Sequence, residues 1–166
     1  MDESGVNTDE TRHYGRAKGG ERVYDATPLN TPKSTTILSS VRMNGETIYT
    51  TFSGAVNGER FQEFLRDHLS TTLRSGDIVI MDNLRTHKVQ GVREIIESTG
   101  ATVLYLPPYS PDLNPIEQMW SKIKAFLRAT KARTVESLLQ AIPSSFSSVT
   151  SIDIMGWFSS SGYIVN

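Results

Sequence analysis

The chain has 166 residues, of which 37% are hydrophobic and 21% charged, a profile typical of one globular domain with its own core. The absence of cysteine excludes disulfides and thiolate metal sites, and no apolar run reaches the length of a membrane-spanning helix. Residues 1–20 lack the apolar core of a signal peptide, so we expect a cytoplasmic protein without a membrane partner. The net charge of −1 gives no general support for nucleic-acid binding.

The first half of the chain predicts a loop, a β-ribbon and a helix, in that order. Residues 3–21 are rich in Gly, Ser, Thr and charged side chains, which favours a loop, and residues 22–28 and 35–43 are strand-like. Asn44-Gly45 separates TILSSVRM from ETIYTTFSG, which is a strong hairpin signal. Asn57-Gly58 starts a helix whose apolar face carries Phe61, Phe64, Leu65 and Leu69.

The second half alternates strands and helices. Residues 78–81 are apolar without alternation, which is typical of a central strand covered on both faces. A helix over 88–98, with Gly100 as its stop signal, leads to a short strand over 102–106, so we expect two parallel strands with a right-handed crossover. The inward face of that helix is expected to carry Val89, Val92, Ile95 and Ile96. The chain ends with helices over 115–129 and 134–142, a serine-rich connector over 144–151 and an apolar segment over 154–158.

This order of elements predicts a mixed α/β sheet with helices on its faces. Functional sites in such sheets form beyond the carboxyl ends of the strands. Asp82 directly follows the strand over 78–81, and Glu117 lies 35 positions later, in the first turn of the helix that follows the next strand. Two carboxylates brought together in this way are the oxygen ligands that suit a hard divalent cation such as magnesium.

Both acidic residues also have ordinary structural explanations. Aspartate is common at turns that end strands, which alone would account for Asp82. Glu117 falls at N3 of its helix, behind Asn114 as the N-cap and Pro115 at N1, and this capping-box pattern requires no ligand.

Four other polar residues stay open between structural and functional roles. By composition alone, Asp2 and Glu3 look like a polar terminus. Asn83 either orients a ligand or caps the segment that follows it. His87 either contacts a phosphate or a metal-bound water, or is a hydrogen-bonded structural histidine.

Two groups of basic residues mark candidate phosphate-binding surfaces. Residues 118–135 contain no acidic side chain but include Lys122, Lys124 and Arg128, and the last two share a helix stripe with Glu117. Arg16 and Lys18 belong to a second, diluted basic cluster near the start of the chain. A solvated helix face, with basic residues favourable near the helix C-terminus, also explains the first group and is the preferred interpretation from charge alone.

Six stretches together resemble the DDE transposases of the mariner superfamily, in their bacterial insertion-sequence branch. They are DESG at 2–5, YGRAKGGER at 14–22, FSGAVNGERF at 52–61, VIMDNLRTHK at 79–88, LPPYSPDLNPIEQMW at 106–120 and GWFSSSGY at 156–163. The resemblance implies an RNase H-like fold, which is a mixed five-stranded sheet flanked by helices, here with its first strand truncated. It also implies a DDE catalytic domain over residues 1–143, and a serine-rich connector and tail over 144–166 that pack on it.

The same resemblance implies the site and its chemistry. Carried over by motif, Asp2, Asp82 and Glu117 become the catalytic residues and the metal ligands. They would hold two Mg²⁺ ions, for which Mn²⁺ could substitute, and the reaction would be phosphoryl transfer on DNA. The implied partners are transposon ends and a target that typically contains a TA dinucleotide, with the full-length protein as a homodimer. Supporting roles then fall to Asn83 and His87, and DNA contacts to Lys122, Lys124, Arg128, Arg16 and Lys18.

The chain departs from the family pattern at its start. It begins one residue before Asp2, where the family has an apolar strand, and it carries no helix-turn-helix region for reading transposon ends. A metal ligand at a fraying terminus loses preorganisation, so we expect weak, nonspecific, metal-dependent DNA nicking at most. An inert remnant that acts only as a DNA- or protein-interaction module is the alternative, and a stand-alone nuclease or phosphatase is a third.

Overall fold

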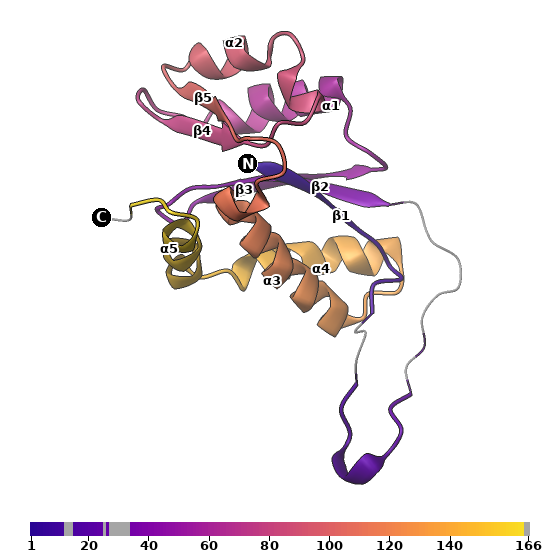
Figure 1. The fold of residues 1–166 in the computed structure, drawn as a ribbon. Helices are drawn as coiled ribbons and strands as arrows, with labels where there is room; N and C mark the ends of the chain where they lie inside the picture. Colours follow the sequence, from indigo (N-terminus) through magenta and orange to yellow (C-terminus); the bar gives the residue numbers. More distant parts are fainter. Residues whose placement is uncertain (12–14, 25, 27–33, 165–166) are drawn as a thin grey trace.

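The computed structural model describes residues 1–11, 15–24, 26 and 34–164. It has a mixed α/β architecture, as predicted, in which helices lie above and below a strand layer (Figure 1). The antiparallel strands β1 (Asp2–Val6), β2 (Thr35–Val41) and β3 (Thr47–Ser53) are adjacent in that order, and β4 (Ile78–Met81) pairs in parallel with β5 (Thr102–Tyr105). The predicted parallel pairing is therefore confirmed.

A hydrogen bond from the amino group of Met1 to the carbonyl oxygen of Ile80, 2.7 Å long, runs from the start of β1 to β4. Pairing between β1 and β2 ends at Asp2 and Ser39. Beyond this point a groove of about 390 Å³ lies between the end of β2 and β4. The five strands consequently form two ladders that meet at Met1.

Strand β1 corrects the prediction of a loop over residues 3–21, which is wrong for residues 3–6. This strand pairs with β2 from Asp2 opposite Ser39 to Val6 opposite Thr35. Asp2, Ser4 and Val6 alternate along it and are all buried. Main-chain pairing with β2 therefore stabilises a strand whose sequence is mostly polar, together with the buried side chain of Val6.

The hairpin and the first helix follow the sequence signals. Strands β2 and β3 are joined at Asn44-Gly45, where Gly45 has a φ of 96° that favours glycine. Helix α1 (Gly58–Phe64) begins after Asn57, whose side chain accepts a hydrogen bond from the amide of Arg60 at 2.9 Å. Residues Leu65–Leu69 continue it as a π-helix.

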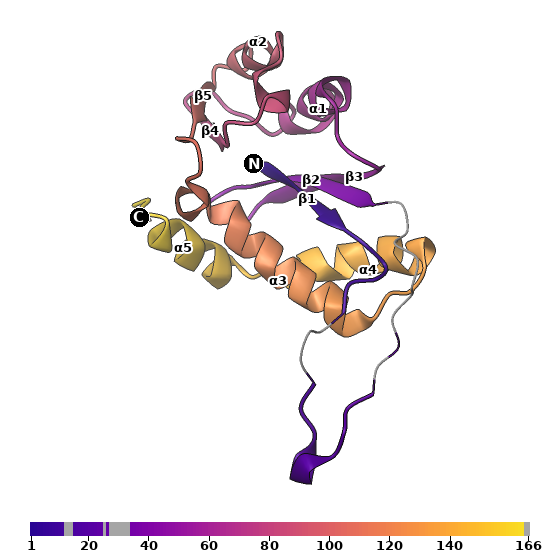
Figure 2. The same cartoon turned by 45° about the vertical axis from the view of Figure 1, so that its right-hand side comes forward.

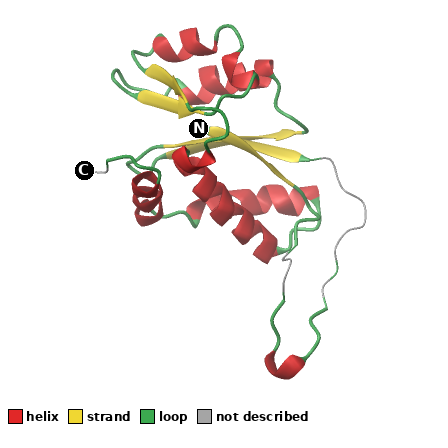
Figure 3. Ribbon diagram, in the orientation of Figure 1, coloured by secondary structure: helices red, strands yellow, loops and turns green. Residues whose placement is uncertain are grey.

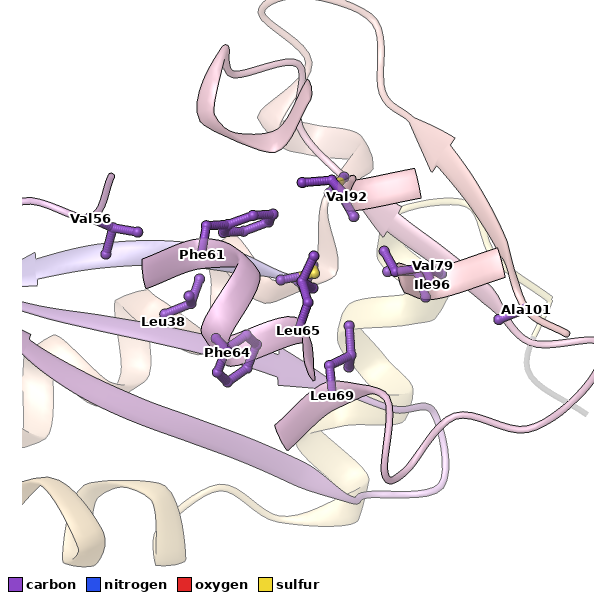
Figure 4. Close-up of a cluster of buried hydrophobic side chains, with 12 residues drawn as sticks. Leu38, Val56, Phe61, Phe64, Leu65, Leu69, Val79, Val92, Ile96 and Ala101 are labelled. Atoms are coloured by element: carbon purple, nitrogen blue, oxygen red, sulfur yellow. The ribbon is translucent and has the colours of Figure 1, made fainter. Parts of the chain in front are cut away.

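The upper layer packs α1, its π-helical extension and helix α2 (Val92–Glu97) against the strands (Figure 4). The helix predicted over 88–98 is shorter, because Gly91 has a left-handed φ of 94° and separates α2 from a 3-10 turn at Thr86–Lys88. Val89 is therefore more than one-third exposed instead of buried. Strand β4 is also less covered than predicted, since the side chain of Ile78 is 63% exposed.

Helices α3 (Pro115–Thr130), α4 (Val135–Ser147) and α5 (Ser151–Ser160) cover the other face of the antiparallel sheet (Figures 2 and 3). The second hydrophobic core lies between these helices and the sheet, where Val6 and Ile37 meet the apolar face of α3. Its other fully or largely buried members include Ile116, Met119, Trp120, Ile123, Leu127, Leu138, Ile142 and Phe146.

The predicted serine-rich connector over 144–151 is wrong for most of its length. Helix α4 continues past Pro143 to Ser147, and α5 already begins at Ser151. Continuation is favoured because the ring of Phe146 stacks on Tyr49 with centroids 4.0 Å apart. The hydroxyl of the buried Ser145 bonds back to the carbonyl of Ile142 at 2.6 Å, so it has a partner inside the helix.

Other predictions along the chain have mixed outcomes. The strand predicted over 22–28 is not formed at residues 22–24 and 26, and its remaining residues lie outside the described part of the chain. No helix in the described ranges is both long and apolar enough to cross a membrane. The division of the chain at residue 143 stays a prediction.

Candidate active site

Asp82 and Glu117 line one cavity at the carboxyl end of the parallel strand pair. Asp82 follows β4, and the segment that leaves β5 leads through Pro107 and Pro108 to the first turn of α3, which carries Glu117. The cavity has a volume of about 420 Å³ and is also lined by Asn83. The fold therefore brings together the two carboxylates that the strand order predicted.

Asp2 lies on β1 and faces α3. Its side chain is 5% exposed, and its Oδ2 accepts a hydrogen bond from the indole Nε1 of Trp120 at 3.2 Å. Burial raises the pKa of Asp2 to about 6, and the negative charges of Glu117 and Asp82 act in the same direction. The three carboxylates are thus near enough to repel one another.

The pKa values of the other two carboxylates, Glu117 and Asp82, shift in opposite directions. Burial and then the charge of Asp82 raise the pKa of Glu117, and Lys124 opposes them. Burial would raise the pKa of Asp82 too, but the contact with His87 and a hydrogen bond from the Leu84 amide lower it overall. Asp82 is therefore the carboxylate that stays ionised most readily.

The capping-box explanation of Glu117 is wrong. Asn114 does occupy the N-cap position and Pro115 the first turn, as predicted. However, the side chain of Asn114 makes no capping hydrogen bond, so the reciprocal arrangement is not formed. The Glu117 carboxylate instead borders the cavity beside Asp82.

His87 is fully buried between two carboxylates. Its Nδ1 forms an ion pair with Oδ1 of Asp82, and its Nε2 lies 3.1 Å from Oε2 of Glu3. Burial alone would lower the pKa of His87, but the two carboxylates raise it to about 9, so the ring is an imidazolium at neutral pH. The hydrogen-bonded histidine of the sequence analysis is thus found, in contact with a candidate ligand.

Sequence reasoning missed Glu3, which composition assigns to a polar terminus. The available signal was strand alternation, which turns Glu3 away from the face that Asp2 occupies. Recognising that signal required knowing that residues 2–6 form a strand.

The donor set fits a hard divalent cation in its chemistry. It consists of carboxylate oxygens, and two of these groups have pKa values raised partly by neighbouring negative charge, which a cation would offset. Across the described ranges, no three Asp, Glu or His side chains already lie in a geometry that would hold one ion.

The predicted DNA-binding residues are distributed over different surroundings. Lys122 forms an ion pair with Asp153 of α5. Arg128 lies 3.8 Å from the carboxylate of Glu10, which is partly buried. Burial raises the pKa of Glu10 overall, and the charges of Lys124 and Arg128 oppose this shift. Arg16 and Lys18 are exposed, in a segment that extends well away from the helices (Figure 1).

The fold is that of solved transposase catalytic domains. A Mos1 transposase paired-end complex with left transposon end has a TM-score of 0.72 at 20% identity, covering 98% of this chain and 55% of that one. A Mos1 strand transfer complex gives 0.70 at 21% identity, with 95% and 49% covered. The Mos1 catalytic domain with raltegravir and Mg gives 0.62 at 21% identity, with 76% and 69% covered. The fold class is therefore RNase H-like, as predicted.

The DDE superfamily endonuclease family matches residues 1–139, and the chain belongs to this family. A human relative, the histone-lysine N-methyltransferase SETMAR, is 38% identical over 71 residues, which is 43% of this chain and 10% of the relative. The chain spans about half the length of the paired-end and strand-transfer proteins that it matches.

Proposed function

We propose that the chain is a transposase catalytic domain that cuts and joins DNA, of the mariner superfamily and its bacterial insertion-sequence branch. The observation that carries the proposal is the shared cavity of Asp82 and Glu117, with the buried carboxylate of Asp2 within electrostatic reach of both. Membership of the DDE superfamily endonuclease family supports the same reading.

Asp2, Asp82 and Glu117 would hold two Mg²⁺ ions, with Mn²⁺ as a substitute. When bound, such ions activate the attacking oxygen and stabilise the leaving oxygen of a phosphoryl transfer. Solved Mos1 structures that contain Mg or Mn support this choice of metal. Within the chain itself, Trp120 orients Asp2 and His87 orients Asp82.

DNA is the proposed partner, in the form of transposon ends and a target that contains TA. The solved complex with a transposon end supports this assignment. Lys124 and Arg128 lie on the same helix as Glu117 and would contact phosphates, with Lys122, Arg16 and Lys18 as further candidates. We also propose a homodimeric full-length protein that acts in the cytoplasm, with the catalytic domain at residues 1–143 and residues 144–166 packed on it.

A second candidate is an inert remnant that serves at most as an interaction module. It is favoured by the geometry of the described acidic residues, which do not yet form a three-ligand site. The two candidates differ in whether metal binding completes the site.

Plasmid nicking by the purified chain in Mg²⁺ or Mn²⁺ tests the proposal. We expect slow, metal-dependent nicking that is lost in Asp82→Asn and Glu117→Gln. The matched control is Asp67→Asn, on the exposed side of the π-helix, which should nick like the unmodified chain. Metal-independent nicking, or nicking that survives Asp82→Asn, would overturn the assignment. An absence of nicking together with an absence of metal binding would establish the inert remnant.

A further inference from the structure

We propose that Glu3 and His87 act together as a positioning pair for Asp82. In this arrangement the imidazole ring links the Glu3 carboxylate on β1 to the Asp82 carboxylate after β4, and so fixes which oxygen of Asp82 faces the cavity. The inference rests on the proposed function, because it assigns Asp82 as a metal ligand.

The position of the His87 ring is determined from four directions. One ring nitrogen contacts Glu3 and the other contacts Asp82. The ring also stacks on Phe61, with centroids 4.5 Å apart. The main-chain carbonyl oxygen of His87 accepts a hydrogen bond from the hydroxyl of Tyr105 at 2.8 Å, which holds the backbone of His87 in place. A ring held in this way presents its Nδ1 at one fixed point beside Asp82.

The contacts of Asp82 are unequal between its two oxygens. The His87 ion pair and the hydrogen bond from the Leu84 amide, 3.2 Å long, both use Oδ1. We therefore assign Oδ2 as the atom that would bind the metal. When one carboxylate oxygen is held by an ion pair and a main-chain amide, the other oxygen points in a defined direction, as is common for ligands that have such neighbouring partners.

Glu3 has a specific task in this arrangement. Nε2 of the buried ring lies 3.1 Å from Oε2 of Glu3, at the end of the ring opposite to the Nδ1 that contacts Asp82. Glu3 therefore holds the end of the ring that Asp82 does not contact. The side chain of Glu3 is 21% exposed, so the contact is mostly shielded from water.

The pair also connects the two ladders of strands. Glu3 follows Asp2 on β1, and neighbouring strand residues point to opposite faces. Asp2 therefore reaches α3 while Glu3 reaches His87 and, through it, Asp82. The Met1–Ile80 hydrogen bond links the two ladders through the main chain. The Glu3–His87–Asp82 contacts link them through side chains, and so relate the position of Asp2 to that of Asp82.

Mn²⁺ affinity, measured by electron paramagnetic resonance on the purified chain, tests the proposal. We expect Glu3→Gln and His87→Gln each to weaken Mn²⁺ binding by roughly 10–100-fold, the range found for partners of metal ligands. The double variant should be no weaker than His87→Gln alone, because both residues act through the same oxygen.

Two controls separate positioning from general destabilisation. Glu46→Gln removes another carboxylate that forms an ion pair, with Arg42, and should leave Mn²⁺ affinity within about twofold. Ile96→Val trims the buried core and should lower the melting temperature without changing the affinity of the folded protein. Unchanged affinity in Glu3→Gln, or losses that add in the double variant, would overturn the proposal.

NMR of the Asp82 carboxyl carbon gives a readout that does not depend on bound metal. In Glu3→Gln we expect the chemical shift of this carbon to change. Glu3 contacts His87, and His87 contacts Asp82, so the change would be transmitted through the imidazole ring. A chain that binds no Mn²⁺ but shows the shift would contradict the proposed function while supporting the Glu3–His87 link. An unchanged carboxyl signal would overturn the link itself.

Discussion

The indole nitrogen of Trp120 donates a hydrogen bond to Oδ2 of Asp2 at 3.2 Å, which joins α3 to the start of β1 across 118 positions of the sequence. Trp120 lies three residues after Glu117 on the same helix. Helix α3 therefore carries one candidate ligand, Glu117, and orients a second, Asp2, through Trp120 in the next turn.

Replacing Trp120 by Phe should lower the free energy of unfolding by about 1–3 kcal/mol, because it removes the indole donor from a buried carboxylate. The smaller ring also leaves space in the core, so the loss combines the hydrogen bond with packing. Urea denaturation at pH 7 measures it. Trp157→Phe, on the partly exposed face of α5, is the control and should cost less. Equal losses in the two variants would contradict the expected role of the hydrogen bond.

Replacing Glu117 by Gln should preserve or raise stability in the presence of EDTA. The charge of Glu117 is repelled by Asp82, and its raised pKa means that ionisation is less favourable in the folded chain. The stabilisation that Mg²⁺ gives the unmodified chain, about 2.7 kcal/mol at a concentration 100-fold above the dissociation constant, should disappear. Melting temperatures with EDTA and with Mg²⁺ measure both effects. A variant that is still stabilised by Mg²⁺ would mean that Glu117 is not a ligand.

The salt dependence of DNA binding should distinguish the basic residues of α3. The double variant Lys124→Ala, Arg128→Ala should reduce the slope of log affinity against log salt by about 0.9 for each lost phosphate contact. Lys122→Ala should change the slope less, since Lys122 forms a closer ion pair with Asp153 than the 3.8 Å contact that Arg128 makes with Glu10. Fluorescence anisotropy at several salt concentrations gives these slopes. An unchanged slope in the double variant would identify the helix face as merely solvated.

Stability should fall in acid partly through Asp77. Burial would raise the pKa of Asp77, but hydrogen bonds from the Arg74 amide and the Arg42 side chain lower it below the usual 3.8. A lowered pKa in the folded state contributes stability above pH 3.8, and this contribution is lost as the pH falls through the folded value. Asp77→Asn should therefore cost about 0.2–1 kcal/mol at pH 7 and little near pH 2. Denaturation at both pH values tests this, and an equal cost at both would contradict it.

The parts of the fold that follow local chemistry could be predicted from the sequence. Asn44-Gly45 determines the hairpin, and the apolar run at 78–81 identifies β4. Strand β1 could not be predicted in the same way, because its pairing with β2 is non-local and its residues are mostly polar. Helix α4 continues past its predicted end at residue 142, because packing of Phe146 on Tyr49 favours helix beyond Pro143.

In the candidate site too, residues marked by local sequence could be predicted, and residues placed by tertiary contacts could not. Asp82 and Glu117 could be placed together because each follows a strand of the parallel pair. Asp2 was proposed only through the family resemblance, since nothing in its immediate sequence marks a strand. Glu3 could not be found because its partner, His87, lies 84 positions away. Contacts of this kind depend on tertiary structure, which residue patterns alone do not determine.

The meeting of the two ladders at Met1 has a consequence for how the chain would unfold. Asp2 is carried by the antiparallel sheet, Asp82 by the parallel pair and Glu117 by a helix below them. Ions bound by all three would act as a cross-link between parts that share few main-chain hydrogen bonds. Metal release and loss of tertiary structure would then occur in one cooperative transition. In the metal-free chain, the β4–β5 pair with its helices and the antiparallel sheet with α3–α5 would unfold in separate steps.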